Sequence, residues 1–104
     1  MINNEVFIGT ELKLNVNINP FGTVTMDDYD FIVEISTQRT SCEFKKSQLL
    51  RQDENNYVVL LDSKKLGLGV LKCKVTAYVP DTDFPDGIRT EVLSIDTGII
   101  IRRG

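Results

Sequence analysis

The sequence predicts an all-β fold, an antiparallel immunoglobulin-like β-sandwich of about seven strands. Residues 11–19 alternate apolar and polar side chains without a break, as expected where side chains point to opposite faces of a strand in turn. Strand-like segments recur between turn signals along the chain, and no helix is predicted that would cover a parallel sheet. A small barrel is the alternative architecture.

Each expected strand carries one row of apolar side chains that should face the core. The strands are expected at residues 11–19, 31–36, 42–45, 57–61, 69–79 and 89–102. The inward rows of four of them are Leu12, Leu14, Val16 and Ile18; Phe31, Val33 and Ile35; Leu71, Cys73, Val75, Ala77 and Val79; and Leu93, Ile95, Ile99 and Ile101.

Turn-forming residues separate these strands. Asn19–Gly22, Asp27–Asp30, residues 37–41 and residues 53–56 contain the Pro, Gly, Asp, Asn and Ser side chains typical of turns. Residues 62–67 predict a single helical turn, with Asp62 or Ser63 as its N-cap and Gly67 at its left-handed exit. Residues 80–87 predict an acidic loop.

Length and composition limit the class of protein. A chain of 104 residues has room for one core, so we expect a single domain, residues 1–104, with a short N-terminal arm, Met1 to Glu5. The net charge of −3, with basic residues clustered only in pairs, gives no reason to bind nucleic acid. No secretory signal begins the chain and no apolar run reaches the ~20 residues of a membrane span. We therefore expect no nucleic acid or membrane partner.

The two cysteines, Cys42 and Cys73, are both expected to point inward. Free thiols are favoured, because nothing indicates secretion, and a disulfide across the sandwich is the alternative.

The sequence offers little catalytic chemistry. It contains no histidine, which excludes a Ser-His-Asp triad and His-rich metal sites. The segment Asp81–Gly87 resembles the start of a calcium loop, but Pro85 stands at its fifth position and Val92 at its twelfth, where a bidentate Glu is needed. We expect an acidic hairpin loop there, no cofactor and no enzymatic activity.

The second face of several strands is also apolar. Scattered apolar surface residues are normal, but so many on a small sandwich predict patches that a protein partner covers. The candidate interface residues, all expected to point outward, are Ile32, Val58, Leu60, Val70, Tyr78, Val92 and Ile100. They favour a homo-oligomer, such as a dimer, or a subunit of a larger assembly.

Several segments in the same order resemble a known family. They are Met26–Glu34, Lys46–Leu49, Asp53–Asp62, Leu66–Gly69, Tyr78–Asp81 and Arg89–Val92. Together they resemble the small immunoglobulin-like virion proteins of crAss-like phages, tailed phages of Bacteroidales, over Leu12 to Ile101. They are also similar to the N-terminal domain of phage baseplate upper proteins.

The resemblance implies a non-enzymatic structural protein of the virion, made in the host cytoplasm. It implies a capsid-surface component, a head fibre or an auxiliary capsid protein, bound to capsid or other virion proteins through strand edges and apolar patches. A baseplate or tail piece is the other position that it implies. A carbohydrate- or host-surface-binding module is the alternative function, with Phe21, Tyr29, Tyr78 and Phe84 as loop-proximal aromatics.

Overall fold

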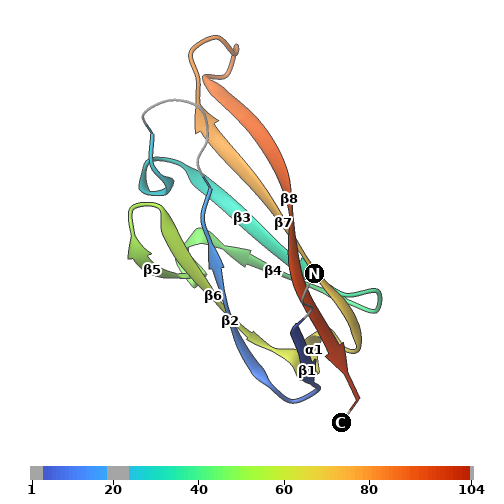
Figure 1. Cartoon of the computed structure of the whole chain (residues 1–104). Helices are drawn as coiled ribbons and strands as arrows, with labels where there is room; N and C mark the ends of the chain where they lie inside the picture. The colour runs from blue at the N-terminus through green and yellow to red at the C-terminus, as the bar shows by residue number, and fades with distance from the viewer. Residues whose placement is uncertain (1–3, 19–23, 104) are drawn as a thin grey trace.

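Two β-sheets packed face to face make up the fold (Figure 1). The computed structural model describes residues 4–18 and 24–103. The five-stranded sheet has the order β1-β8-β7-β3-β4, and the three-stranded sheet has the order β2-β6-β5. The predicted immunoglobulin-like sandwich is confirmed, and because the two sheets are separate the chain is not a closed barrel.

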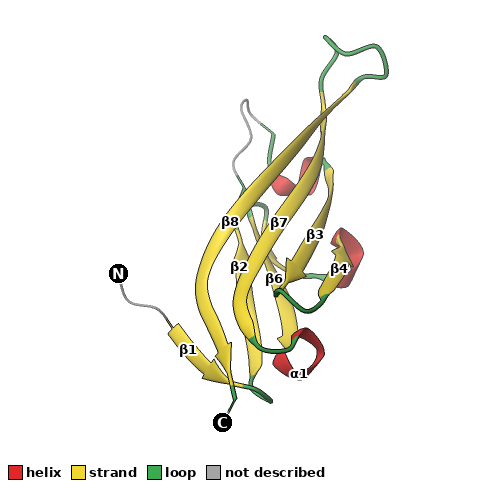
Figure 2. Cartoon of the chain, turned by 90° about the vertical axis from the view of Figure 1, so that its right-hand side faces the viewer, coloured by secondary structure: helices red, strands yellow, loops and turns green. Residues whose placement is uncertain are grey.

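The described residues form eight strands of different lengths. They are β1 (Asn4–Phe7), β2 (Glu11–Val16), β3 (Asp30–Ser36), β4 (Ser41–Lys45), β5 (Leu50–Asp53), β6 (Asn56–Asp62), β7 (Gly69–Pro80) and β8 (Ile88–Arg102). The same residues also form short helical segments between strands: η1 (Met26–Asp28), η2 (Lys46–Gln48) and α1 (Ser63–Leu66). The hairpin formed by β7 and β8 extends past the other strands at one end of the molecule (Figure 2).

Two strands were not expected from the sequence. β1 contains Asn4 and Glu5, which the sequence places in an N-terminal arm, and it pairs in parallel with residues 99–102 of β8. The sheet is therefore not purely antiparallel. β5 pairs with β6 at the edge of the smaller sheet, and all of its side chains are exposed.

The core lies between the inner faces of the two sheets. Phe31, Val33 and Val75 are fully buried at its centre, on β3 and β7, which pair antiparallel. The ring of Tyr57, from β6 in the opposite sheet, meets Phe31 edge to face with centroids 5.2 Å apart. The predicted inward rows of β3 and β7 are confirmed, because every member is buried.

The turn between β6 and β7 also agrees with its prediction. The carboxylate of Asp62 accepts a hydrogen bond from the backbone N–H of Lys64 at 3.0 Å, so Asp62 is the N-cap of α1. Gly67 leaves the turn with φ of 79°, a conformation that favours glycine. Ser63 is fully buried, and its hydroxyl accepts a hydrogen bond from the N–H of Gly9 at 2.8 Å.

The cysteines flank the same residue in one sheet. Ile35 on β3 pairs with Cys42 on β4 and with Cys73 on β7, so a whole strand separates the two sulfur atoms. Both thiols are free, as predicted. The alternative of a bridge across the sandwich is wrong, because both cysteines belong to the same sheet.

Burial should make the two thiols react differently. Burial raises the pKa of Cys73 to about 11, whereas Cys42 is half-buried. We expect a thiol reagent at neutral pH to modify Cys42 well before Cys73, because the thiolate is the reactive form and reagent must reach it. Mass spectrometry of partly labelled protein measures this, and equal labelling of the two sites would contradict it.

The same Val→Ala substitution should change stability differently on the two faces of the five-stranded sheet. Val75→Ala should lower the free energy of unfolding by about 2 kcal/mol, from two buried methyl-sized groups at ~0.8 kcal/mol each plus a cavity. Val92→Ala is the control, because Val92 is 61% exposed and should change stability by less than about 0.5 kcal/mol. Urea unfolding measures both, and similar losses would contradict the assigned faces.

Candidate interaction surfaces

The seven candidate interface residues lie in three separate places on two opposite outer faces. Ile32, Tyr78 and Val92 lie on the outer face of the five-stranded sheet. Val70 and Ile100 lie on the same face where β7 begins and β8 ends. The other two, Val58 and Leu60, are on β6 in the three-stranded sheet.

The first group is a contiguous surface, which we call the Val92 patch (Ile32, Thr76, Tyr78 and Val92). Ile32, Thr76 and Val92 occupy one row across β3, β7 and β8, and Tyr78 lies in the next row. Val92 is the most exposed at 61%, whereas Ile32 and Tyr78 are half-buried. This is the one place where the register brings three of the predicted residues together.

The second group is a single cross-strand pair. Val70 and Ile100 are directly opposite each other, and Ile100 also pairs with Glu5 of β1. Val70 is 42% exposed, and Ile100 is half-buried between the two neighbouring strands. The ion pair of Glu5 with Arg102, at 3.0 Å, borders this apolar pair.

The third group includes one residue that points outward but is buried. Val58 points to the outer face of its sheet as expected, but it is only 6% exposed. It lies between Asn15 and Leu50 in the register of its sheet. Leu60 is 52% exposed as predicted, and Leu50, which was not predicted, is 53% exposed beside it.

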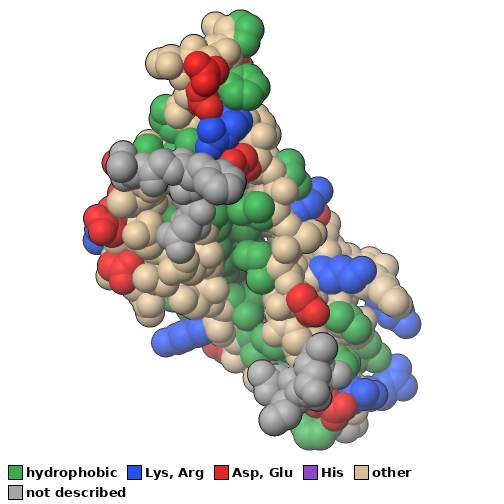
Figure 3. Space-filling view, turned by 45° about the horizontal axis from the view of Figure 1, so that its top comes forward, with side chains coloured by type: hydrophobic (Ala, Val, Ile, Leu, Met, Phe, Trp, Pro, Cys, Tyr) green, Lys and Arg blue, Asp and Glu red, His purple; other side chains and the backbone are tan. Residues whose placement is uncertain are grey.

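The inner face of β8 has the expected parity but is not fully covered. Leu93 pairs with the buried Val75 and shares its face, yet Leu93 is 37% exposed. Among the described residues no strand lies beyond β8 between Ile88 and Gly98, so one flank of Leu93 is open. Figure 3 shows hydrophobic side chains in a lengthwise band on the face of the molecule that it presents.

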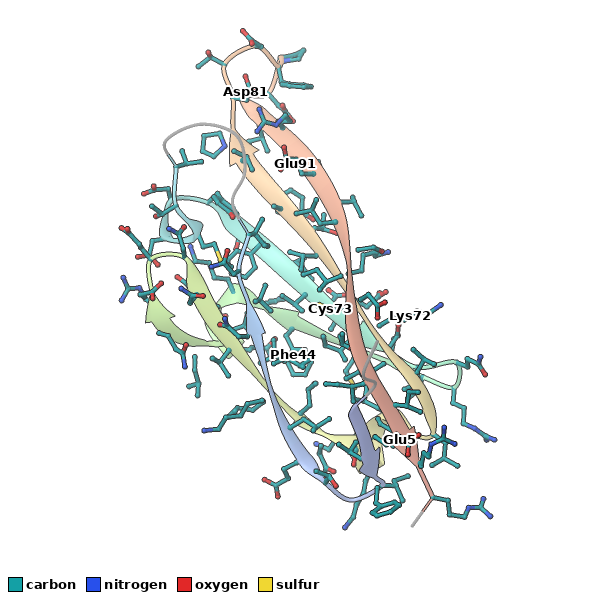
Figure 4. The ribbon with its side chains drawn as sticks, viewed as in Figure 1. Glu5, Phe44, Lys72, Cys73, Asp81 and Glu91 are labelled. Atoms are coloured by element: carbon teal, nitrogen blue, oxygen red, sulfur yellow. The ribbon has the colours of Figure 1, made fainter. Side chains whose placement is uncertain are left out.

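A charged cluster occupies the same inner face nearer the hairpin loop. The guanidinium of Arg89 donates to the carboxylate of Asp81 at 2.6 Å and to that of Glu91 at 3.2 Å. Asp81 and Glu91 both lie at the projecting end of the β7–β8 hairpin (Figure 4). The buried Tyr29 lies close by, and burial together with the charge of Glu91 raises the pKa of Tyr29 to about 12.

The loop between β7 and β8 directs its carboxylates to its own backbone. Asp81 accepts from the N–H of Asp83 at 3.0 Å, and Asp86 accepts from the N–H of Ile88 at 3.1 Å. The predicted acidic hairpin loop is confirmed by these bonds and by the pairing of Asp81 with Gly87. In the part of the chain that the structure describes, no three His, Cys, Asp or Glu side chains gather as a metal site.

A second polar cluster fastens η1 to the smaller sheet. The carboxylate of Asp27 accepts hydrogen bonds from Arg51 at 2.7 and 2.9 Å and from the hydroxyl of Tyr57. Lys46 donates to the carbonyl oxygens of Asp27 and Tyr29, and its ammonium lies over the rings of Phe31 and Tyr57. A hollow of about 720 Å³ opens beside this cluster. Its cations already have partners within the chain, so the cluster serves the fold.

The loop-proximal aromatics divide by exposure. Tyr29 is buried and Tyr78 is half-buried, so neither presents a free ring face. Phe84 is 44% exposed in the hairpin loop. Phe21 lies outside the described residues.

Comparison with known proteins adds no relative. No family model, no curated protein and no solved structure matches the chain. Among the described residues, none of the helices has the length and apolar character needed to cross a membrane.

The Asp27 cluster predicts a pH dependence of stability. The hydrogen bonds from Arg51 and then Tyr57 lower the pKa of Asp27 from 3.8 to about 2. A carboxyl group whose pKa is lower in the folded protein than in the unfolded chain stabilises the fold when it is ionised. This stabilisation is complete above the pKa of the unfolded chain and is lost as the pH falls towards the pKa of the folded protein. We expect Asp27→Asn to be less stable than the native protein at pH 6, with the difference shrinking between about pH 4 and pH 2.

Urea midpoints for both proteins across this range measure the effect. Asp28→Asn is the matched control, because Asp28 receives its hydrogen bonds from Thr25 rather than from a cation. A difference between native protein and Asp27→Asn that stays constant down to pH 2 would rule out the assigned role.

Proposed function

We propose that this domain is a non-enzymatic structural protein of a phage virion. Its place is the capsid surface, as a head fibre or auxiliary capsid protein, and it reaches the virion after synthesis in the host cytoplasm. The observation that carries the proposal is apolar surface on the outer faces of both sheets, combined with a sheet edge that no described strand covers. The family resemblance of the sequence supplies the virion context.

The Val92 patch is the surface best suited to a protein neighbour. It combines Val92, an aliphatic residue that is 61% exposed, with the half-buried Ile32 and Tyr78 on the outer face of one sheet. Apolar and aromatic groups of this kind form the centre of protein interfaces, with charged groups at the rim. Lys74 and Glu34, in the adjoining row, form such a charged border.

The open edge supports the same role by a different mechanism. Unpaired backbone N–H and C=O groups along β8 attract another strand, and assembly proteins use such edges for β-augmentation. Backbone pairing provides affinity, and the neighbouring side chains provide specificity. An assembly subunit needs both, and β8 presents them side by side.

A carbohydrate- or host-surface-binding module is the second candidate. Phe84 favours it, because this ring is 44% exposed at the tip of the projecting hairpin, where a sugar face could stack. Binding on a glycan array that Phe84→Ala abolishes would favour this candidate over the first.

The virion role predicts where the protein is found. Mass spectrometry of phage particles purified on a density gradient should detect the chain, and immunogold labelling should place it on the head. Recovery of the chain only from the soluble fraction of lysed host cells would overturn the proposal.

The patch should also control incorporation. Val92→Asp places a charge at the centre of the apolar patch, so its incorporation into particles should fall at least about tenfold, the effect of 1.4 kcal/mol. Ser94→Asp is the control, since Ser94 has the same outward parity two residues along β8 but lies beyond the patch. Equal incorporation of the two variants would exclude the Val92 patch as the contact.

A further inference from the structure

The outer edge of β8 carries backbone groups in a definite pattern. Asp81 donates its N–H to the carbonyl of Gly87, so the hydrogen-bonded position just beyond the β7–β8 ladder is residues 81 and 87. Such pairs alternate with non-bonded ones along antiparallel strands. Residues 89, 91, 93 and 95 therefore bond to β7, whereas Thr90, Val92 and Ser94 direct their N–H and C=O groups away from it.

No described strand meets those outward groups. β1 pairs with β8 only over residues 99–102, and in the described ranges Ile88 to Asp96 pair with β7 alone. The N–H of Ile88 bonds to the side chain of Asp86. Thr90 and Val92 are left as the central groups of the open edge, in the hairpin that projects past the other strands (Figures 1 and 2).

The side chains along this edge match those of a second, antiparallel copy of the same strand. On the inner face, Arg89 and Glu91 flank Thr90. On the outer face, Thr90 is flanked by Ile88, which is 43% exposed, and Val92, which is 61% exposed. A second copy of the strand, turned round at Thr90, therefore brings opposite charges together on one face and apolar groups together on the other.

We infer that β8 pairs with β8 of a second copy of this chain, antiparallel and about a two-fold axis at Thr90. Thr90 bonds to Thr90 of the other copy, and Ile88 lies opposite Val92. Arg89 lies opposite Glu91 in a non-bonded pair, in which side chains approach most closely. The two five-stranded sheets then form one continuous sheet of ten strands.

Four other two-fold registers are poorer. An axis at Arg89 or Glu91 sets like charges opposite each other, and one at Val92 sets Glu91 opposite Leu93. An axis at Ser94 pairs Val92 with Asp96 and runs the strand into the irregular stretch where Gly98 has φ of 68°. Inward-pointing charges on an edge strand deter unspecific pairing, so the arrangement selects against these alternatives while matching its own copy.

This inference names the partner that pairs with the open strand edge, and it rests on the proposed function. The test of the pairing nevertheless needs only the purified chain. Thr90→Cys places two thiols across the axis, in a bonded pair whose Cα atoms lie about 5.5 Å apart, which a disulfide spans. Ser94→Cys is the matched control, because Ser94 is also exposed on the same edge but faces residue 86 in this register.

Under mild oxidation at micromolar concentration, Thr90→Cys should form a covalent dimer, and Ser94→Cys and the native chain, with its half-buried Cys42, should not. No dimer from Thr90→Cys, or equal dimer from Ser94→Cys, overturns the inference. If the chain is nevertheless found in virions, the proposed function stands and only the self-pairing falls.

A charge exchange tests the side-chain matching separately. Arg89→Glu and Glu91→Arg each place like charges opposite one another in a homodimer, so each should weaken dimerisation in sedimentation by at least about tenfold. A mixture of the two variants restores both opposite-charge pairs and should dimerise again. A mixture that stays monomeric overturns the Arg89–Glu91 register.

Discussion

The alternation of side chains between two faces, combined with the register of β3, β7 and β8, determines the structure at every level. It buries Phe31, Val33 and Val75 against the smaller sheet and sends Ile32, Tyr78 and Val92 to the opposite face. The same alternation directs every second backbone group of β8 towards β7 and the others away from it. The core, the Val92 patch and the open edge are thus three consequences of one geometry.

The edge of β8 is only partly covered by a neighbouring strand. It spans 15 residues, but β1 pairs with it over only four of them, so the rest of that edge has one neighbouring strand among the described residues. The inner face changes there from Leu93 and Ile95 to the ion-paired Arg89 and Glu91. A partly accessible ion pair contributes little stability by itself. The Arg89–Glu91 ion pair instead provides selectivity, because few strands other than a second copy of β8 can pair with this edge in register.

The sequence predicted most of the fold, because long alternating strands carry a strong periodic signal. β5 was missed because Leu50 to Asp53 are all exposed and show no alternation, and β1 because Val6 is its only half-buried apolar side chain. The candidate surface was harder. Parity placed Val92 and Val58 outside alike, but only the register shows that Ile32 and Tyr78 join Val92, while Asn15 and Leu50 flank Val58 on the two neighbouring strands. Parity is a local property, and exposure depends on neighbours distant in sequence.

The central claim is that the outward N–H and C=O groups of β8 form hydrogen bonds with β8 of a second copy of the chain. Hydrogen exchange of individual amides at several protein concentrations tests it most directly. The amides of Arg89 and Glu91, bonded to β7, should be protected at every concentration, whereas those of Thr90 and Val92 should exchange fast in dilute solution and slow down as dimers form. If Thr90 and Val92 exchange at the same fast rate at all concentrations, the edge stays unpaired and the account is wrong.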